Sequence, residues 1–219
     1  MSNSIFIRTH LGLGDALIQN GLVRILASND RVVFPAKIHN FESVKFMFRD
    51  LPNVEVVSVR DDVEAELLSE AEASVLRLGL FSLTEPLESA WDRQMYRQAR
   101  VPFDCRWEAF QVHRDRQDEY PVPRTNYVFL HDDYERGFCI DESRLPSDVY
   151  RIRPERPNSL NTIFGWLPLI VEASEIHCID SCFAILVDSI PTKAIRLVLH
   201  DYARKGLPPT YRKKWEHLT

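Results

Sequence analysis

The segment Thr9-His-Leu-Gly-Leu-Gly-Asp-Ala-Leu-Ile-Gln-Asn-Gly21 gives the first indication of the fold. A short apolar run, Ile5–Ile7, precedes it, and a run with helical spacing, Asp15–Leu26, begins inside it. An apolar run followed by apolar residues at every third or fourth position predicts a strand and then a helix. The glycines between the two runs predict a tight turn. We therefore expect a strand, a glycine turn and a helix at the start of the chain.

Two glycines and one carboxylate define the predicted turn. Gly12 and Gly14 allow a tight backbone with positive φ, which other residues resist. Such a turn brings backbone N–H groups to a helix N-terminus, a natural place for an anion. Asp15 falls in the first helical turn, where its charge suits the helix dipole. Asp15 can cap the helix, repel a phosphate or serve as a base, and its role decides the function.

The glycine pattern does not match the known nucleotide-binding fingerprints. The sequence Gly-x-Gly-Asp lacks the third glycine of the dinucleotide fingerprint. No acidic residue closes a later strand at the expected distance, because the second predicted strand ends at Phe34-Pro35. The Gly-Lys-Ser/Thr of a P-loop is also absent. An α/β protein whose first turn simply needs glycines is the structural alternative.

The composition is that of an ordinary globular protein. The chain has 219 residues, 27% charged and 45% hydrophobic, so it can bury a core as one or two domains. Its apolar runs are shorter than the roughly 20 residues that span a membrane. The start, Met1-Ser-Asn-Ser, lacks the basic region of a signal peptide. We expect a cytoplasmic protein without a membrane span, and the net charge of −5 argues against a nonspecific nucleic-acid binder.

The cysteines do not predict a disulfide framework in a chain of this size. Cys178 and Cys182 lie close together in the sequence with His177 alongside, which leaves a zinc site as an alternative. Cys178 falls at the end of a predicted strand and Cys182 in the first turn of a helix, where small buried thiols are commoner. We expect no bound metal and no cofactor.

Strand and helix patterns alternate along both halves of the chain, which predicts parallel sheets covered by helices. The polar stretch 111–124 ends in two prolines and suggests a domain boundary. The predicted fold class is α/β, with two small Rossmann-like lobes, 1–120 and 121–219, facing a cleft. We expect Pro209–Leu218 to form a C-terminal helix that packs back across the lobes. The predicted strands are Ser4–Arg8, Arg31–Phe34, Val54–Val59, Ser74–Leu78, Tyr127–Leu130, Val149–Arg153, Glu175–Ile179 and Ala194–Leu199.

Polar residues that follow the predicted strands are the candidate ligand-binding groups, because ligands of open α/β sheets bind at the carboxyl ends of the strands. The pair Asp180-Ser181 opens a predicted helix, where it is either a cap or a source of hydroxyl and amide groups for a phosphate. Arg136 and Arg204 are able to supply bidentate phosphate contacts.

Two segments resemble a known family. The stretch 9–24 resembles the first turn of GT-B glycosyltransferases related to bacterial heptosyltransferases, which carry a short Gly-Asp turn after the first strand. The stretch Ala173–Phe183 resembles the late donor-binding segment of the same fold, where a strand ends in a small polar pair beneath the nucleotide-sugar phosphates. This chain is much shorter than a usual GT-B enzyme, and Cys182-Phe183 replaces the small residues that follow the polar pair in heptosyltransferases.

The resemblance implies a compact GT-B-like glycosyltransferase. Such an enzyme moves a sugar from a nucleotide-sugar co-substrate to a hydroxyl of a glycan or other acceptor, here with inversion and without metal. Asp15 matches the family's general base, and His10 is placed to orient the acceptor or assist that base. The expected acceptor-side residues are Gly12, Leu13, Gly14 and Asn20. The expected donor-binding residues are His131, Asp132, Arg136, Gly137, Phe138, Asp180, Ser181, Cys182 and Phe183, with Arg204 as a further phosphate contact.

Three other interpretations remain open. Asp132-Asp133 is an alternative metal site of the other glycosyltransferase fold, although that fold uses Asp-x-Asp. A noncatalytic nucleotide- or sugar-binding module needs the same phosphate-binding groups but not Asp15. Sugar transfer to modified bases of phage DNA is the third, supported by the basic and aromatic tail Tyr202–Trp215.

Overall fold

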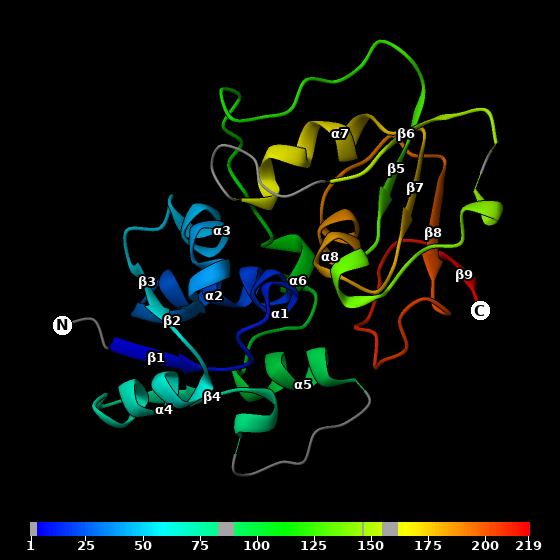
Figure 1. The fold of residues 1–219 in the computed structure, drawn as a ribbon. Helices are drawn as coiled ribbons and strands as arrows, with labels where there is room; N and C mark the ends of the chain where they lie inside the picture. Colours follow the sequence, from blue (N-terminus) through cyan, green and yellow to red (C-terminus); the bar gives the residue numbers. More distant parts are fainter. Residues whose placement is uncertain (1–3, 83–89, 146, 155–161) are drawn as a thin grey trace. The chain divides into compact units, whose positions relative to one another are not determined.

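The computed structural model describes residues 4–82, 90–145, 147–154 and 162–219. The chain forms two compact units, Met1–His113 and Arg114–Thr219, and each unit contains its own parallel sheet (Figure 1). The predicted mixed α/β class with parallel sheets is therefore confirmed. The division between the units falls inside the polar stretch 111–124. Within the described residues, no helix is both long enough and apolar enough to cross a membrane.

Unit 1 contains a four-stranded sheet in the order β3-β2-β1-β4. Its strands are β1 (Ser4–Arg8), β2 (Arg31–Lys37), β3 (Val54–Val59) and β4 (Val75–Arg77). Its helices are α1 (Leu13–Ile18), α2 (Asn20–Ala27), α3 (Ile38–Phe48), α4 (Asp62–Glu70), η1 (Gly79–Phe81), α5 (Trp91–Gln98) and α6 (Cys105–Glu108). The sequence pattern of Pro86–Arg100 predicts a helix; the first part of this range lies outside the described residues, and α5 lies in the rest.

β2 continues through Pro35, beyond its predicted end. The backbone N–H of Val32 donates toward β3, to the carbonyl of Asn53, so by alternation the nitrogen of Pro35 faces β1. The pairing between β1 and β2 stops at Phe6 and Val33. A proline is tolerated at this position because the ladder with β1 has already ended there.

One glycine of unit 1 is required by close packing. A Cβ at Gly21 would lie 1.9 Å from the carbonyl oxygen of Cys105, so only glycine lets α2 approach α6 this closely. The sequence pattern gave no sign of this contact, because the two residues are far apart in the chain.

Unit 2 contains a five-stranded sheet in the order β6-β5-β7-β8-β9, all parallel. Its strands are β5 (Tyr127–His131), β6 (Tyr150–Ile152), β7 (Glu175–Cys178), β8 (Arg196–His200) and β9 (Glu216–Leu218). Its helices are η2 (Tyr134–Arg136), η3 (Glu142–Arg144), η4 (Ile163–Trp166), α7 (Leu167–Glu172) and α8 (Cys182–Ser189). Because the strands are parallel, the loops after β5, β7 and β8 leave the sheet at one edge.

The predicted C-terminal helix is wrong. The chain from Pro209 onward is extended, and it ends in β9, which pairs with β8 (Figure 1). The buried carboxylate of Asp188 accepts hydrogen bonds from the backbone N–H groups of Arg212 and Lys213 at 3.0 and 2.9 Å and from the indole of Trp215 at 3.2 Å. These long-range bonds use backbone donors that a helix would need, so the segment completes the sheet of its own unit instead.

Candidate functional site

The first turn places Asp15 at an accessible helix start. Gly12 precedes α1 with φ −71° and ψ 146°, and Gly14 lies inside the helix. Among the described residues, the glycines with positive φ are Gly79 and Gly137, so positive φ at Gly12 and Gly14 was a wrong expectation. A Cβ at Gly12 would lie 2.4 Å from Oδ2 of Asp15, so a larger residue would displace the end of that side chain. The half-buried carboxylate therefore folds back over an exposed glycine.

His10 packs against η1, the turn that follows β4. Its Nε2 accepts a long hydrogen bond of 3.5 Å from the backbone N–H of Leu80, and its ring packs 5.0 Å from the ring of Phe81. The N–H of Gly79, whose φ is +62°, donates to Oε1 of Gln98 at 2.8 Å. His10 therefore contacts the η1 turn through its ring and through Nε2.

Asn20, predicted on the acceptor side, is buried and holds the end of unit 1. Its amide exchanges two hydrogen bonds with the backbone of Gln111, at 3.1 and 3.0 Å. Arg24 also donates to the carbonyl of Gln111, at 2.8 Å, and forms a bidentate pair with Asp50. The side-chain amide of Asn20 is therefore engaged with the backbone of Gln111, in the same unit.

The carboxyl edge of the unit 2 sheet brings together residues from the ends of β5 and β7. The hydroxyl of Ser181 lies 3.0 Å from Nδ1 of His131, and the His131 ring stacks on Phe183 with centroids 4.3 Å apart. Ser181 precedes α8 but makes no side-chain hydrogen bond to its amides. The capping role considered for Ser181 is therefore absent, and its hydroxyl is aimed at β5 instead.

The acidic residues of the loop after β5 form hydrogen bonds and ion pairs within unit 2. Asp132 accepts a hydrogen bond from Ile140 at 3.2 Å and pairs with Arg153 at 3.3 Å. Its burial raises the pKa of the carboxyl group, and the hydrogen bond and the arginine oppose that rise. Asp133 caps η2 and pairs with Arg136, and Gly137 closes the turn with φ +76°. The arginine expected to bind phosphate therefore already has a carboxylate partner.

Metal-ligating side chains do not gather in the part of the chain that the structure describes. Its residues contain no group of three or more His, Cys, Asp or Glu side chains able to hold a metal ion. Within these residues the alternatives built on Asp132-Asp133 and on Cys178 with Cys182 lack a complete ligand set. Burial raises the pKa of the Cys178 thiol, which disfavours the thiolate that a metal requires.

A pocket of 490 Å³ opens at the same edge of unit 2. Arg204 donates to the carbonyl of Asp180, and its guanidinium lies 5.5 Å from the ring of Phe138. The Tyr211 hydroxyl donates to the Asp180 carboxylate at 3.0 Å, while burial raises the pKa of that carboxyl group. The pocket is lined by Asp180, Asp201, Tyr202, Arg204, Lys205, Gly206, Pro208 and Thr219. Its lining residues include cations, carboxylates and an aromatic ring, and most of the accessible surface inside the pocket is apolar.

Sequence reasoning found only part of this pocket. Asp180 and Arg204 were predicted because they follow strands directly. Lys205, Pro208 and Thr219 come from the loop after β8 and from the chain end beyond β9. These residues lie outside the predicted strands and helices, so no local pattern pointed to them.

Comparisons with known proteins show the fold but not the family. No protein-family model matches the sequence, and no curated protein matches it. The structure matches that of the bacterial iron-containing dodecameric glycosyltransferase TibC from enterotoxigenic E. coli, with a TM-score of 0.57 and 13% identity. The match covers 90% of this chain and 58% of the TibC chain. The chain thus has a glycosyltransferase fold and spans little more than half the length of TibC.

TibC contains iron, but the described residues of this chain include no set of side chains able to hold an iron ion. The absence of a three-residue cluster there, noted above, does not fit a protein-held iron ion. We therefore assign no chemical step to a metal.

Proposed function

We propose that this chain is a glycosyltransferase that moves a sugar from a nucleotide-sugar to an acceptor hydroxyl, with inversion and without a metal ion. The observation that carries the proposal is the fold likeness to TibC over 90% of the chain. The cationic and aromatic pocket at the carboxyl edge of unit 2 supports it, because this edge is where open parallel sheets bind ligands.

The proposal assigns donor binding to unit 2. The side chain of Ser181 does not cap the N-terminus of α8, and a helix N-terminus is a favourable position for an anion. Arg204 and Lys205 supply positive charge in the adjoining pocket. Together these groups are suited to a diphosphate, whose charge increases as it leaves the sugar. Arg136 is exposed and contributes only if its pair with Asp133 opens.

The proposal assigns the general base to Asp15 in unit 1. The acceptor hydroxyl oxygen forms a bond to the anomeric carbon as the bond from that carbon to the diphosphate oxygen breaks. The bonding electron pair leaves with the nucleoside diphosphate, and the acceptor proton passes to the carboxylate of Asp15. Asp15 is partly accessible to solvent and lies beside exposed Gly12, as a base that meets an acceptor must be.

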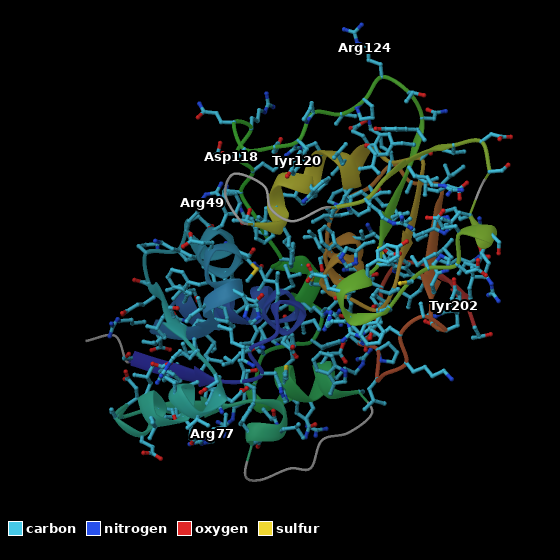
Figure 2. The ribbon with its side chains drawn as sticks, viewed as in Figure 1. Arg49, Arg77, Asp118, Tyr120, Arg124 and Tyr202 are labelled. Atoms are coloured by element: carbon cyan, nitrogen blue, oxygen red, sulfur yellow. The ribbon has the colours of Figure 1, made fainter. Side chains whose placement is uncertain are left out.

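A thermal-shift screen with UDP-, GDP-, ADP- and CMP-sugars in EDTA tests donor binding. A donor at 100 times its Kd should stabilise the protein by about 2.7 kcal/mol. Arg204→Ala should weaken binding by roughly 10- to 100-fold, the value of a charge-assisted phosphate contact. Arg124→Ala is the matched control, because Arg124 is an exposed arginine in the loop before β5 (Figure 2). Binding that requires an added divalent cation would contradict the metal-free proposal.

Transfer assays separate an enzyme from a noncatalytic binding module. Glycans, small hydroxyl compounds and DNA with hydroxymethylated bases serve as acceptors, and donor hydrolysis is followed in parallel. Transfer to any of them supports the proposal. Tight donor binding with neither transfer nor hydrolysis would favour the binding module, which the engaged state of His10 and Asn20 also suits.

A further inference from the structure

Two histidines in the middle of the unit 2 sheet form a pair that the proposed mechanism does not use. His177 on β7 and His200 on β8 are both fully buried. Nδ1 of His177 lies 2.9 Å from Nε2 of His200, so the two rings share a hydrogen bond. A buried pair of this kind is stable only when the remaining ring nitrogens also find partners.

Each end of the histidine pair has a polar partner. Nε2 of His177 lies 3.3 Å from the carboxylate of Glu175, at the start of β7. Nδ1 of His200 lies 3.0 Å from the hydroxyl of Tyr202, in the loop after β8 (Figure 2). The Tyr202 oxygen also accepts a hydrogen bond of 2.8 Å from the backbone N–H of Asp141. Glu175, His177, His200 and Tyr202 therefore form a continuous chain of hydrogen bonds, which we call the histidine relay.

The relay has only one direction when both histidines are neutral. A carboxylate only accepts, so His177 must donate to Glu175 from Nε2. Its Nδ1 is then an acceptor, and His200 must donate to it from Nε2. Nδ1 of His200 is in turn an acceptor, which requires the Tyr202 hydroxyl to donate inward. The hydroxyl oxygen is left to accept from Asp141, as observed.

Burial favours the neutral form of both rings. Burial lowers the pKa of His177, and Glu175 and Glu216 oppose this while Arg196 adds to it. Burial also lowers the pKa of His200 to about 4, assisted by His177, Arg144 and Arg196 and opposed by Asp141. These groups come from β7, β8, β9 and η3. Both rings are therefore neutral at neutral pH, as the direction of the relay requires.

The relay ends at the pocket wall. Tyr202 lines the pocket, and the guanidinium of Arg144 lies 4.6 Å from its ring. The Tyr202 hydroxyl thus joins the loop after β8 to the η3 segment. We propose that Glu175, His177 and His200 are positioning residues that orient Tyr202 on the pocket wall, and that protonation of the relay in acid releases this wall. The role of this wall in donor binding rests on the proposed function, whereas the relay itself does not.

Long-range nitrogen–proton NMR of the histidine rings in the full chain, without ligand, tests the relay. At pH 7 both rings should show the tautomer that carries its proton on Nε2. On acidification the Asp141 amide resonance should move together with the His200 ring signals, at a pH well below 6. A proton on Nδ1 of either ring, or an Asp141 amide that ignores the titration, would overturn the proposal.

Two tyrosine variants separate the relay from a general effect of lost hydroxyls. Tyr202→Phe keeps the ring but removes the donor to His200, so the Nδ1 signal of His200 should shift. Tyr150→Phe is the matched control, because Tyr150 is an exposed tyrosine on β6 of the same unit. Equal shifts in both variants would contradict the relay. If Tyr202→Phe fails to fold, the histidine tautomers measured by NMR in the wild-type protein still test the relay.

A binding arm tests the positioning role. For any of the UDP-, GDP-, ADP- or CMP-sugars that binds, Tyr202→Phe should raise KM roughly three- to tenfold with little change in kcat. The weakening should disappear below the pH at which His200 is protonated, because the wild-type wall is then released as well. An unchanged KM would refute the positioning role. A screen without any bound donor would contradict the proposed function and leave the NMR test of the relay intact.

Discussion

Both sheets are parallel, but their carboxyl edges differ in how their charged groups are used. In unit 1, Arg8, Lys37 and Arg77 end three of the strands, and Asp62 and Glu66 of α4 pair with them. In unit 2, Arg204 and Lys205 line a pocket, and Ser181 leaves the start of α8 uncapped. One edge has most of its cations neutralised within the fold, and the other keeps polar groups directed into a pocket.

This difference shows that strand ends alone do not identify a ligand site. The guanidinium of Arg8 is nearly inaccessible and bonds to Glu66 at 2.8 Å and to the Asp62 carbonyl at 2.9 Å. A basic residue at the end of a parallel strand is a candidate for phosphate binding only when no carboxylate of the same fold takes it first. Asp15 is the group at the unit 1 edge to which the proposal gives a chemical role.

The largest expected effect comes from Asp15→Asn. Asparagine keeps the size of the side chain but cannot take a proton, so kcat should fall by roughly 10²–10⁴-fold. Donor affinity in unit 2 should stay within about twofold, and unfolding free energy within about 1 kcal/mol, because asparagine also suits a helix start. Asp148→Asn, at an exposed position, is the control. Transfer by Asp15→Asn at the wild-type rate would give Asp15 a purely structural role.

Gly12→Ala should disturb the same carboxylate without removing it. The new Cβ would lie 2.4 Å from Oδ2 of Asp15 and would push the flexible end of that side chain aside. A misplaced base typically costs up to about 100-fold in rate. Thermal unfolding should change little, because the displaced atom is at the end of a side chain. A loss of stability without a loss of rate would show that the contact is structural.

Glu66→Ala tests whether the unit 1 edge is held by its charges. Glu66 bonds to Arg8 and bidentately to Arg77, and its pKa is lowered to about 2, mainly by the hydrogen bond from Arg77. Removal leaves the buried Arg8 with fewer partners and should cost about 1–3 kcal/mol in urea unfolding. Glu64→Ala on the same helix breaks an exposed pair with Arg60, which solvent screens, so it should cost clearly less than Glu66→Ala. Equal losses would contradict this ranking.

The smallest expected effect is the order in which the two units respond to acid. His200 has a folded pKa of about 4 against 6.5 for the free side chain, so its neutral pairing loses stability as pH falls from about 6.5 toward 4. Glu66 has a folded pKa of about 2 against 4.5, so its contribution is lost only from about pH 4.5 toward 2. Hydrogen exchange should show unit 2 losing protection about one to two pH units above unit 1. The reverse order would contradict both assignments.

Much of the strand–helix order could be predicted from local pattern. Val54–Val59 is a strand with the predicted bounds, because a run rich in valine follows the turn residues Pro52 and Asn53. The predicted helix Asp15–Leu26 is instead two helices, interrupted at Gln19. The buried Gln19 amide donates to the Thr9 hydroxyl and to the Asp15 carbonyl, at 3.0 and 3.1 Å. The spacing of apolar residues in Asp15–Leu26 gave no sign of this break.

The candidate site was less predictable than the fold. Asp180, Ser181 and Arg204 were found because they follow strands, and the roles of the predicted site residues remain predictions. The engagement of Asn20 with Gln111 spans most of unit 1, and that of Ser181 with His131 spans much of unit 2. Single-sequence patterns report on neighbours within a few residues, so such partners are invisible to them.

The sequence by itself determined the α/β class and the approximate positions of most strands, because these follow from short-range spacing of apolar residues. The tertiary structure decided that the tail forms β9 and that Tyr202 joins a relay of buried histidines. Asp188 takes the tail's N–H groups, and His177 reaches His200 from the neighbouring strand. The physical reason is that a buried polar group must find a partner, and that partner is chosen by the packing of distant segments.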